Sequence, residues 1–140
     1  MPGTIVRRIV ASNTFLKYFS TPIPVLSSPT QLSGSRLISV EIDYEVTVLA
    51  LTDLAIVVYR ITRGADGSPA TVATEAFTYD AGHDMDAERS AVKKHRLTAT
   101  LTSPPWIDND QYVVIYLQFH PQVTSQFWFS GMFANYYWRD

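Results

Sequence analysis

The sequence contains no cysteine, which excludes disulfide bonds and thiolate metal sites. Charged residues make up only 17% of the 140 residues, below the roughly 25% usual in soluble domains. The net charge is −2 and the basic residues are scattered, so nucleic-acid binding is not expected. No apolar stretch approaches the roughly 20 residues that span a bilayer, and residues 1–10 are too short and too charged for a secretory signal. The sequence predicts neither a signal peptide nor membrane insertion.

Motifs for catalysis and cofactor binding are also lacking. There is no G-x-S-x-G nucleophile turn and no Gly-rich phosphate loop. The acids Glu41, Asp43 and Glu45 alternate with apolar residues, so we expect them on the polar face of a strand, solvated or paired with basic residues. We therefore predict a protein that is not an enzyme and that holds no cofactor.

Two acidic stretches contain residues of the types that bind metal ions. His83, Asp84 and Asp86, with His95 further on, offer nitrogen and oxygen ligands, but their spacing matches no known calcium loop. Asp108-Asn109-Asp110 offers oxygen ligands and is equally what a tight turn prefers. Polar loops explain both stretches, so no metal site is predicted, and whether either binds an ion stays open.

The clearest periodic signal lies between Ile38 and Val48. Apolar residues occupy every second position and alternate with Ser39, Glu41, Asp43, Glu45 and Thr47. A period of two places the apolar side chains on one face of a strand. One wet face is typical of antiparallel sheets. The segment is predicted to be a long antiparallel strand.

Further β-rich segments follow, separated by turn signals. Residues 54–61 are apolar almost throughout, as expected for a central strand, and a loop rich in Gly and Asp follows at 64–69. Residues 80–89 are either a long loop or one helical turn. Further strands are expected at 5–10, 15–19, 71–79, 95–101, 112–119 and 127–138. About eight strands and no amphipathic helix predict an all-β fold, an antiparallel β-sandwich of the jelly-roll kind.

The first 35 residues differ from the rest. Two short strands are followed by residues 20–35, which hold three prolines and many Ser and Thr residues and so indicate an extended connection. We predict an N-terminal arm and Pro/Ser-rich connection at 1–35 and a β-sandwich domain at 36–140. An arm of this kind suits docking onto a neighbouring subunit, through Ile5, Val6, Ile9 and Phe15.

Aromatic residues crowd the last third of the chain. Strict alternation along 127–138 places them on both faces, with Phe127, Phe129, Phe133 and Tyr137 on one and Trp128, Tyr136 and Trp138 on the other. A sandwich strand needs only one apolar face, so the second is expected to contact something else. Three explanations stay open: a subunit interface through Trp128, Tyr136 and Trp138, glycan stacking on Trp106 or Trp128, or a thick core or cover at the end of the chain.

The order of features between residues 36 and 138 also carries a resemblance. The long alternating strand comes first, Tyr59-Arg60 precedes the Gly-containing loop, a Thr-rich strand and an Asp/Asn turn lead to Tyr112-Val113-Val114, and Phe129-Ser130-Gly131-Met132-Phe133 lies in the closing strand. This order resembles β-sandwich modules of phage and viral fibres, spikes and decoration proteins. The resemblance implies a trimeric, non-enzymatic structural protein of the virion, assembled in the host cytoplasm. It also implies capsid decoration or host attachment, with capsid or tail proteins, or a surface glycan, as partners.

Overall fold

The structure is a computed structural model of the chain, and it describes residues 7–10, 17–23 and 35–138. Nearly all regular elements in these residues are strands, because β-branched and aromatic residues dominate them. The elements are β1 (Arg7–Val10), β2 (Lys17–Ile23), β3 (Ser35–Thr47), β4 (Asp53–Thr62), β5 (Thr71–Glu75), β6 (Phe77–Tyr79), α1 (Asp86–Ser90), β7 (Lys94–Leu101), β8 (Trp106–Ile107), β9 (Gln111–His120) and β10 (Gln126–Trp138).

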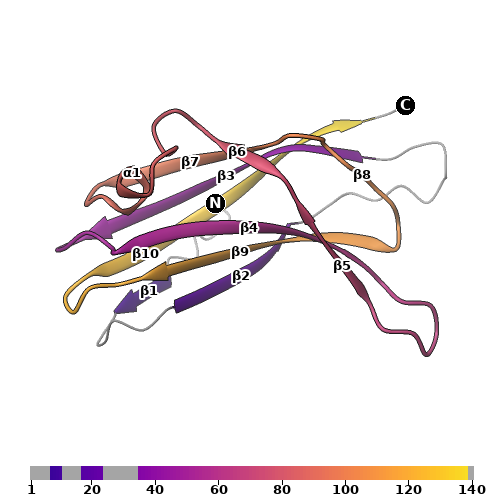
Figure 1. The fold of residues 1–140 in the computed structure, drawn as a ribbon, viewed down its shortest axis with the longest axis horizontal. Coiled ribbons are helices and arrows are strands. Elements are labelled where there is room, and N and C mark those ends of the chain that lie inside the picture. The colour runs from indigo at the N-terminus through magenta and orange to yellow at the C-terminus, as the bar shows by residue number, and fades with distance from the viewer. Residues whose placement is uncertain (1–6, 11–16, 24–34, 139–140) are drawn as a thin grey trace, which may run out of the picture.

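These strands form two antiparallel sheets that pack face to face (Figure 1). Sheet A has the order β1-β10-β3-β7-β6, and the short β8 also pairs with β3. Sheet B has the order β2-β9-β4-β5. The predicted all-β sandwich is confirmed.

The connections between the sheets follow the jelly-roll pattern. The chain alternates between sheets from β1 to β4, continues in sheet B with β5, and crosses back into sheet A at β6. The strands β1, β10, β3 and β7 thus face β2, β9, β4 and β5, which is an eight-strand jelly roll of two Greek keys. The strand β6 adds an edge to sheet A beyond β7.

The core lies between the sheets and is built from alternate residues of the long strands. In β3 the predicted alternation is confirmed for four residues, which are all at most 2% exposed: Val40, Ile42, Tyr44 and Val46. Leu54, Ile56 and Val58 of β4 face them from sheet B, together with alternate residues of β9. At roughly 1.5–3 kcal/mol per buried large apolar side chain, this layer is the main source of stability.

Two of the six apolar residues predicted to share the buried face of β3 do not lie there. The pairing of β3 with β10 is irregular next to Ile38, so Leu37 takes the buried position and Ile38 is partly exposed. Val48 lies beyond the end of β3, is 63% exposed and has a φ of 72°. A turn closed by the Leu49 N–H and the Thr47 carbonyl, 2.9 Å apart, forces this conformation.

The described parts of residues 1–35 are strands of the sandwich itself. β1 pairs with β10 and β2 pairs with β9, and each is the terminal strand of its sheet. Ile9 lies opposite Phe127 in this pairing. Ile5, Val6 and Phe15 lie outside the described residues. Contact of this region with a neighbouring subunit stays a prediction.

Candidate functional site

A bulge in β10 changes which aromatic residues share a face. Phe129 pairs with Tyr44 and Gly131 with Asp43, so Ser130 is an extra residue that reverses the alternation. Phe127 is buried before the bulge, whereas Met132, Ala134 and Tyr136 pack against the core after it. The strict alternation predicted for β10 is therefore wrong beyond Ser130.

The predicted interface residues of β10 have different environments as a result. Tyr136 packs against the core, and burial raises its pKa to about 12. Trp128 is half-buried on the opposite face, with its indole N–H 3.4 Å from Thr47 Oγ1. Trp138 pairs with Ser35 at the end of the strand. Among the β10 side chains that the structure describes, the rings most exposed to solvent are those of Phe133 and Tyr137, at 57% and 61%.

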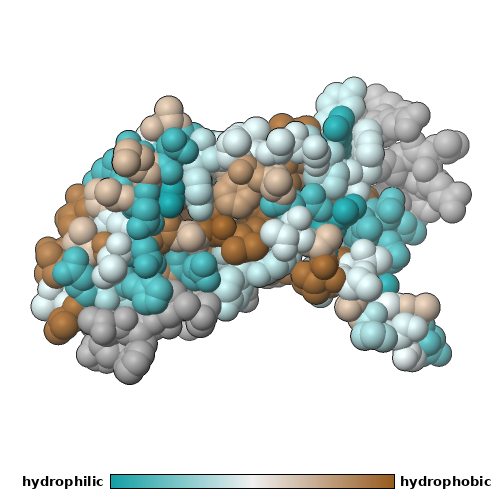
Figure 2. All heavy atoms as spheres, viewed as in Figure 1, coloured by the Kyte–Doolittle hydropathy of each residue, from teal (hydrophilic) through white to brown (hydrophobic). Residues whose placement is uncertain are grey.

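A larger apolar surface lies on the outer face of sheet B. Apart from the Asp53–His120 pair at one end, the residues of β4 and β9 that alternate with the core residues are also mostly apolar, and all of them are at least partly exposed: Ala55, Val57, Tyr59, Ile61, Tyr112, Val114, Tyr116 and Gln118. Val72 of β5 extends the surface and is 61% exposed. We call these nine residues the outer face of sheet B. Figure 2 shows hydrophobic residues over β4 and β5 near the middle of the molecule, with polar residues around them.

The outer face of sheet A is, by contrast, charged. Its residues on β3 and β7 include Glu41, Asp43, Glu45, Lys94 and Arg96. Arg96 Nε lies 3.0 Å from Asp43 Oδ1, which confirms the expected pairing with a basic residue across the sheet for Asp43. An antiparallel sheet commonly has one wet face. Sheet A follows this rule and sheet B departs from it.

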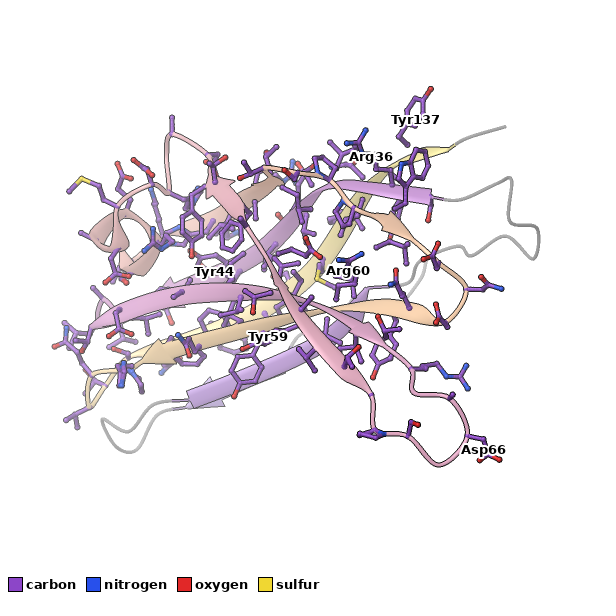
Figure 3. The ribbon with its side chains drawn as sticks, turned by 45° about the vertical axis from the view of Figure 1, so that its right-hand side comes forward. Arg36, Tyr44, Tyr59, Arg60, Asp66 and Tyr137 are labelled. Atoms are coloured by element: carbon purple, nitrogen blue, oxygen red, sulfur yellow. The ribbon has the colours of Figure 1, made fainter. Side chains whose placement is uncertain are left out.

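The two tryptophans considered for glycan stacking do not lie together. Trp106 pairs with Arg36 and Trp128 with Glu45. These partners are nine residues apart on β3, which corresponds to about 30 Å. Trp106 instead shares a row with Arg36 and Tyr137, on three adjacent strands. Figure 3 shows Arg36 and Tyr137 close together at this end of the molecule. The Arg36 guanidinium lies 5.9 Å from the centre of the Trp106 ring, and Trp106 is 39% exposed.

The acidic segment between β6 and β7 closes one end of the sandwich through the buried Arg89. Arg89 Nε donates to the Leu54 carbonyl at 2.8 Å, and Nη1 donates to the carbonyls of His83 and Asp84 at 2.8 and 2.7 Å. The guanidinium carbon lies 4.1 Å from the centre of the Tyr79 ring. These contacts join the segment to β4 and β6.

Side chains of this segment and of β6 bond to the backbone of β4 where sheet B has no neighbouring strand. The strand β5 pairs only with Val58–Thr62, so the first half of β4 extends beyond it. There the Leu54 N–H donates to Asp86 Oδ1 at 2.9 Å, and the Ile56 N–H donates to Tyr79 Oη at 3.1 Å. Buried backbone groups need such partners. The role of Asp86 is thus to satisfy the edge of sheet B.

Two buried histidines lie behind Arg89. His83 Nδ1 lies 2.8 Å from Asp80 Oδ2, and His83 Nε2 lies 3.1 Å from His95 Nδ1. His95 Nε2 lies 2.8 Å from the Ala91 carbonyl oxygen, and its ring stacks on Tyr44 at 4.4 Å. The sequence does carry a signal for the burial of His95, because it alternates in phase with Leu97, Ala99 and Leu101.

Among the described residues, no group of three or more His, Asp or Glu side chains is placed to hold a metal ion. The nitrogens of His83 and His95 are engaged with one another and with Asp80 and Ala91. Asp108 lies in a turn in which the Gln111 N–H donates to its carbonyl at 3.0 Å. No helix in the described part of the chain is long and apolar enough to cross a membrane.

Comparison with family models, with curated proteins and with solved structures finds no match.

Proposed function

We propose that this chain is a non-enzymatic structural protein, a self-associating jelly-roll subunit that decorates or extends a viral or phage particle. The jelly-roll order of its strands supports this proposal, because viral capsid domains use this architecture. Lectins and other domains use it too, so the fold alone does not fix the function. The proposal therefore depends on a surface feature.

The observation that carries it is the outer face of sheet B. Between the Asp53–His120 pair at one end and Arg63 and Asp110 at the other, the outward positions of β4 and β9 hold no charged residue. Monomeric soluble proteins rarely expose a contiguous apolar patch of this extent. A second molecule that covers it removes this surface from water.

We assign a second copy of the same chain as the occupant. The strands β2, β9, β4 and β5 are 7, 10, 10 and 5 residues long, and at about 3.4 Å per residue and about 4.8 Å between strands they give roughly 520 Å² per copy. Two copies then bury about 1,000 Å², close to the lower limit for specific interfaces. An uncharged face matches itself, whereas the outer face of sheet A offers charges that the contact would leave unpaired.

Sedimentation velocity over a wide concentration range tests this proposal. We expect the wild type to self-associate, and Val57→Lys to sediment as a monomer because it places a charge in the middle of the outer face of sheet B. Thr100→Lys is the matched control: it lies on a central strand of sheet A, faces outward and should behave as the wild type. Circular dichroism checks that both variants fold.

Two results contradict the proposal. One is a wild type that stays monomeric into the high micromolar range. The other is a folded Val57→Lys variant that associates as strongly as the wild type. The number of copies in the assembly comes from the same data, and the trimer implied by the resemblance stays a prediction.

Carbohydrate binding is a second candidate, favoured by the row of Trp106, Arg36 and Tyr137. Trp106 and Tyr137 lie two strands apart, about 10 Å, and both rings are exposed beside the Arg36 side chain. Aromatic faces stack on sugar rings, and guanidinium groups bind oxygen atoms. Binding on a glycan array that is lost in Trp106→Ala and kept in Trp128→Ala supports this function, and a blank array contradicts it.

A further inference from the structure

The distances between Asp80, His83, His95 and Ala91 determine how many ring protons the two histidines carry. The Ala91 carbonyl can only accept, so His95 Nε2 carries a hydrogen. The contact between the two rings holds one hydrogen, and an ionised Asp80 requires another on His83 Nδ1. Three hydrogens on four nitrogens give the pair one positive charge, opposite the Asp80 carboxylate.

The surroundings keep Asp80 ionised and disfavour a charge on His95. Partial burial opposes the charge of Asp80, but the Thr98 N–H, which donates to Oδ1 at 2.8 Å, and His83 outweigh it, so the Asp80 pKa is lowered. Burial lowers the pKa of His95, against the opposite effect of its bond to Ala91. His95 is thus the neutral ring, protonated on Nε2.

Other ionisable groups face this pair from the neighbouring elements. Tyr44 of β3 stacks on His95, and its hydroxyl donates to the Arg89 carbonyl at 2.8 Å. The positive groups Arg89 and Lys93 oppose a further positive charge, since Arg89 donates to the His83 carbonyl and Lys93 contributes to the lowered His95 pKa. Tyr79 of β6 and Asp86 of α1 act on the Tyr44 hydroxyl, and the Asp84 carbonyl accepts a bond from Arg89.

We propose that the chain Asp80–His83–His95 is an acid-sensitive clasp, which holds residues 80–95 against the end of the sandwich at neutral pH and opens when the histidine pair takes up another proton. A fourth hydrogen would place two N–H groups against each other across 3.1 Å. It would also place a second positive charge on the buried histidine pair, next to the positive charge of Arg89. Both effects are relieved only if the rings separate. This inference does not depend on the proposed function.

The opened clasp uncovers the end of the core. Tyr44 and Leu54 lie directly against the segment that the clasp holds, since both are hydrogen-bonded to Arg89. The backbone edge of β4 at Leu54 and Ile56 loses its partners Asp86 and Tyr79 at the same time. A free strand edge next to exposed apolar residues is a site where another chain can pair. The clasp thus links acidity to the exposure of a new surface.

Hydrogen–deuterium exchange of residues 80–95 tests the clasp. Rates are measured between about pH 7.5 and about pH 5 and corrected for the intrinsic chemistry of exchange. An unfolded histidine titrates near 6.5, so the opening equilibrium should rise below that pH by up to about tenfold per pH unit. Below that pH the open pair binds up to two protons and the closed pair only one, so acid favours the open state.

The three histidines provide the variants. His95→Gln removes the ring that takes up the additional proton and retains an amide that can donate to Ala91, so exchange of the segment should no longer rise below about pH 6.5. His120→Gln is the control, because His120 also pairs with an aspartate, Asp53 at 2.8 Å, but its side chain is 41% exposed and lies outside the clasp. This variant should keep the full pH dependence.

Several results would overturn the proposal: constant protection in the wild type below about pH 6.5, a rise in exchange below that pH that survives in His95→Gln, or a rise that disappears in His120→Gln. A wild-type NMR measurement covers the case in which His95→Gln does not fold. Long-range proton–nitrogen correlations at neutral pH should show His95 protonated on Nε2 and unprotonated on Nδ1. Any other form of His95 contradicts the clasp.

Discussion

Replacing Arg89 by methionine is the most informative test of the architecture. The change retains most of the apolar stem and removes the guanidinium, which makes three bonds to backbone carbonyls on two sides of the sandwich. Arg89 is only 8% exposed, so water does not readily replace it. The carbonyls of Leu54, His83 and Asp84 then lose a charged donor.

The magnitude follows from these bonds. A hydrogen bond to a charged group contributes about 1.5–3 kcal/mol, and removing one partner from a buried charged network typically costs about 3–5 kcal/mol. We expect the free energy of unfolding to fall by about 4 kcal/mol. With a urea dependence of about 2 kcal/mol per molar, the midpoint of urea unfolding should fall by about 2 M.

Urea unfolding followed by tryptophan fluorescence measures this shift. Arg96→Met is the matched control, because Arg96 pairs with Asp43 on the surface and its side chain is 70% exposed. Its midpoint should stay at the wild-type value, since exposed ion pairs contribute little. If Arg89→Met unfolds at the same urea concentration as Arg96→Met, Arg89 does not hold the end of the sandwich together.

Three further predictions concern the core and the turns. Phe127→Ala should lower the free energy of unfolding by about 3–5 kcal/mol, because Phe127 is buried between Tyr44 and Phe119. Phe133→Ala should change this free energy little in the isolated subunit, because the Phe133 ring is exposed. Urea unfolding compares the two variants. Val48→Gly should raise stability by about 0.5–1 kcal/mol, because it relieves a φ of 72°, and Val123→Gly in another exposed loop should not; thermal unfolding that shows no difference between them refutes this. The Tyr136 hydroxyl has a pKa of about 12 in the folded protein and near 10 in the unfolded chain, so the unfolded chain loses this proton first as the pH rises. The free energy of unfolding should therefore fall above pH 10, and it should fall less in Tyr136→Phe. Urea unfolding at increasing pH measures this difference.

The sequence predicts those parts of the fold that depend on local alternation. The regular part of β3 is confirmed because every second residue from Val40 to Val46 is apolar, and burial follows that pattern. The bulge at Ser130 depends on how β10 pairs with β3, a partner more than 80 residues away, and no local pattern announces it. Strict alternation therefore predicts Phe133 on the same face as the buried Phe127 and Tyr136 on the other, whereas Tyr136 packs against the core and Phe133 is exposed.

The buried polar cluster could be predicted only in part. The phase of His95 relative to Leu97 places it on the inner face, which is a local signal. The burial of Arg89 has no such signal, since its carbonyl partner Leu54 is 35 residues away and belongs to the other sheet. Likewise, the apolar residues at 54–61 predict a central strand, but only the assembled sheet reveals that one side of it faces outward.

Cross-linking of a single introduced cysteine tests the central claim most directly, because the natural chain has none. A short bis-maleimide should join Val57→Cys subunits into covalent dimers at concentrations where sedimentation shows association. Thr100→Cys, on the outer face of sheet A, should stay monomeric under the same conditions. Efficient cross-linking of Thr100→Cys with none at Val57→Cys would contradict the assignment of the outer face of sheet B as the contact between subunits.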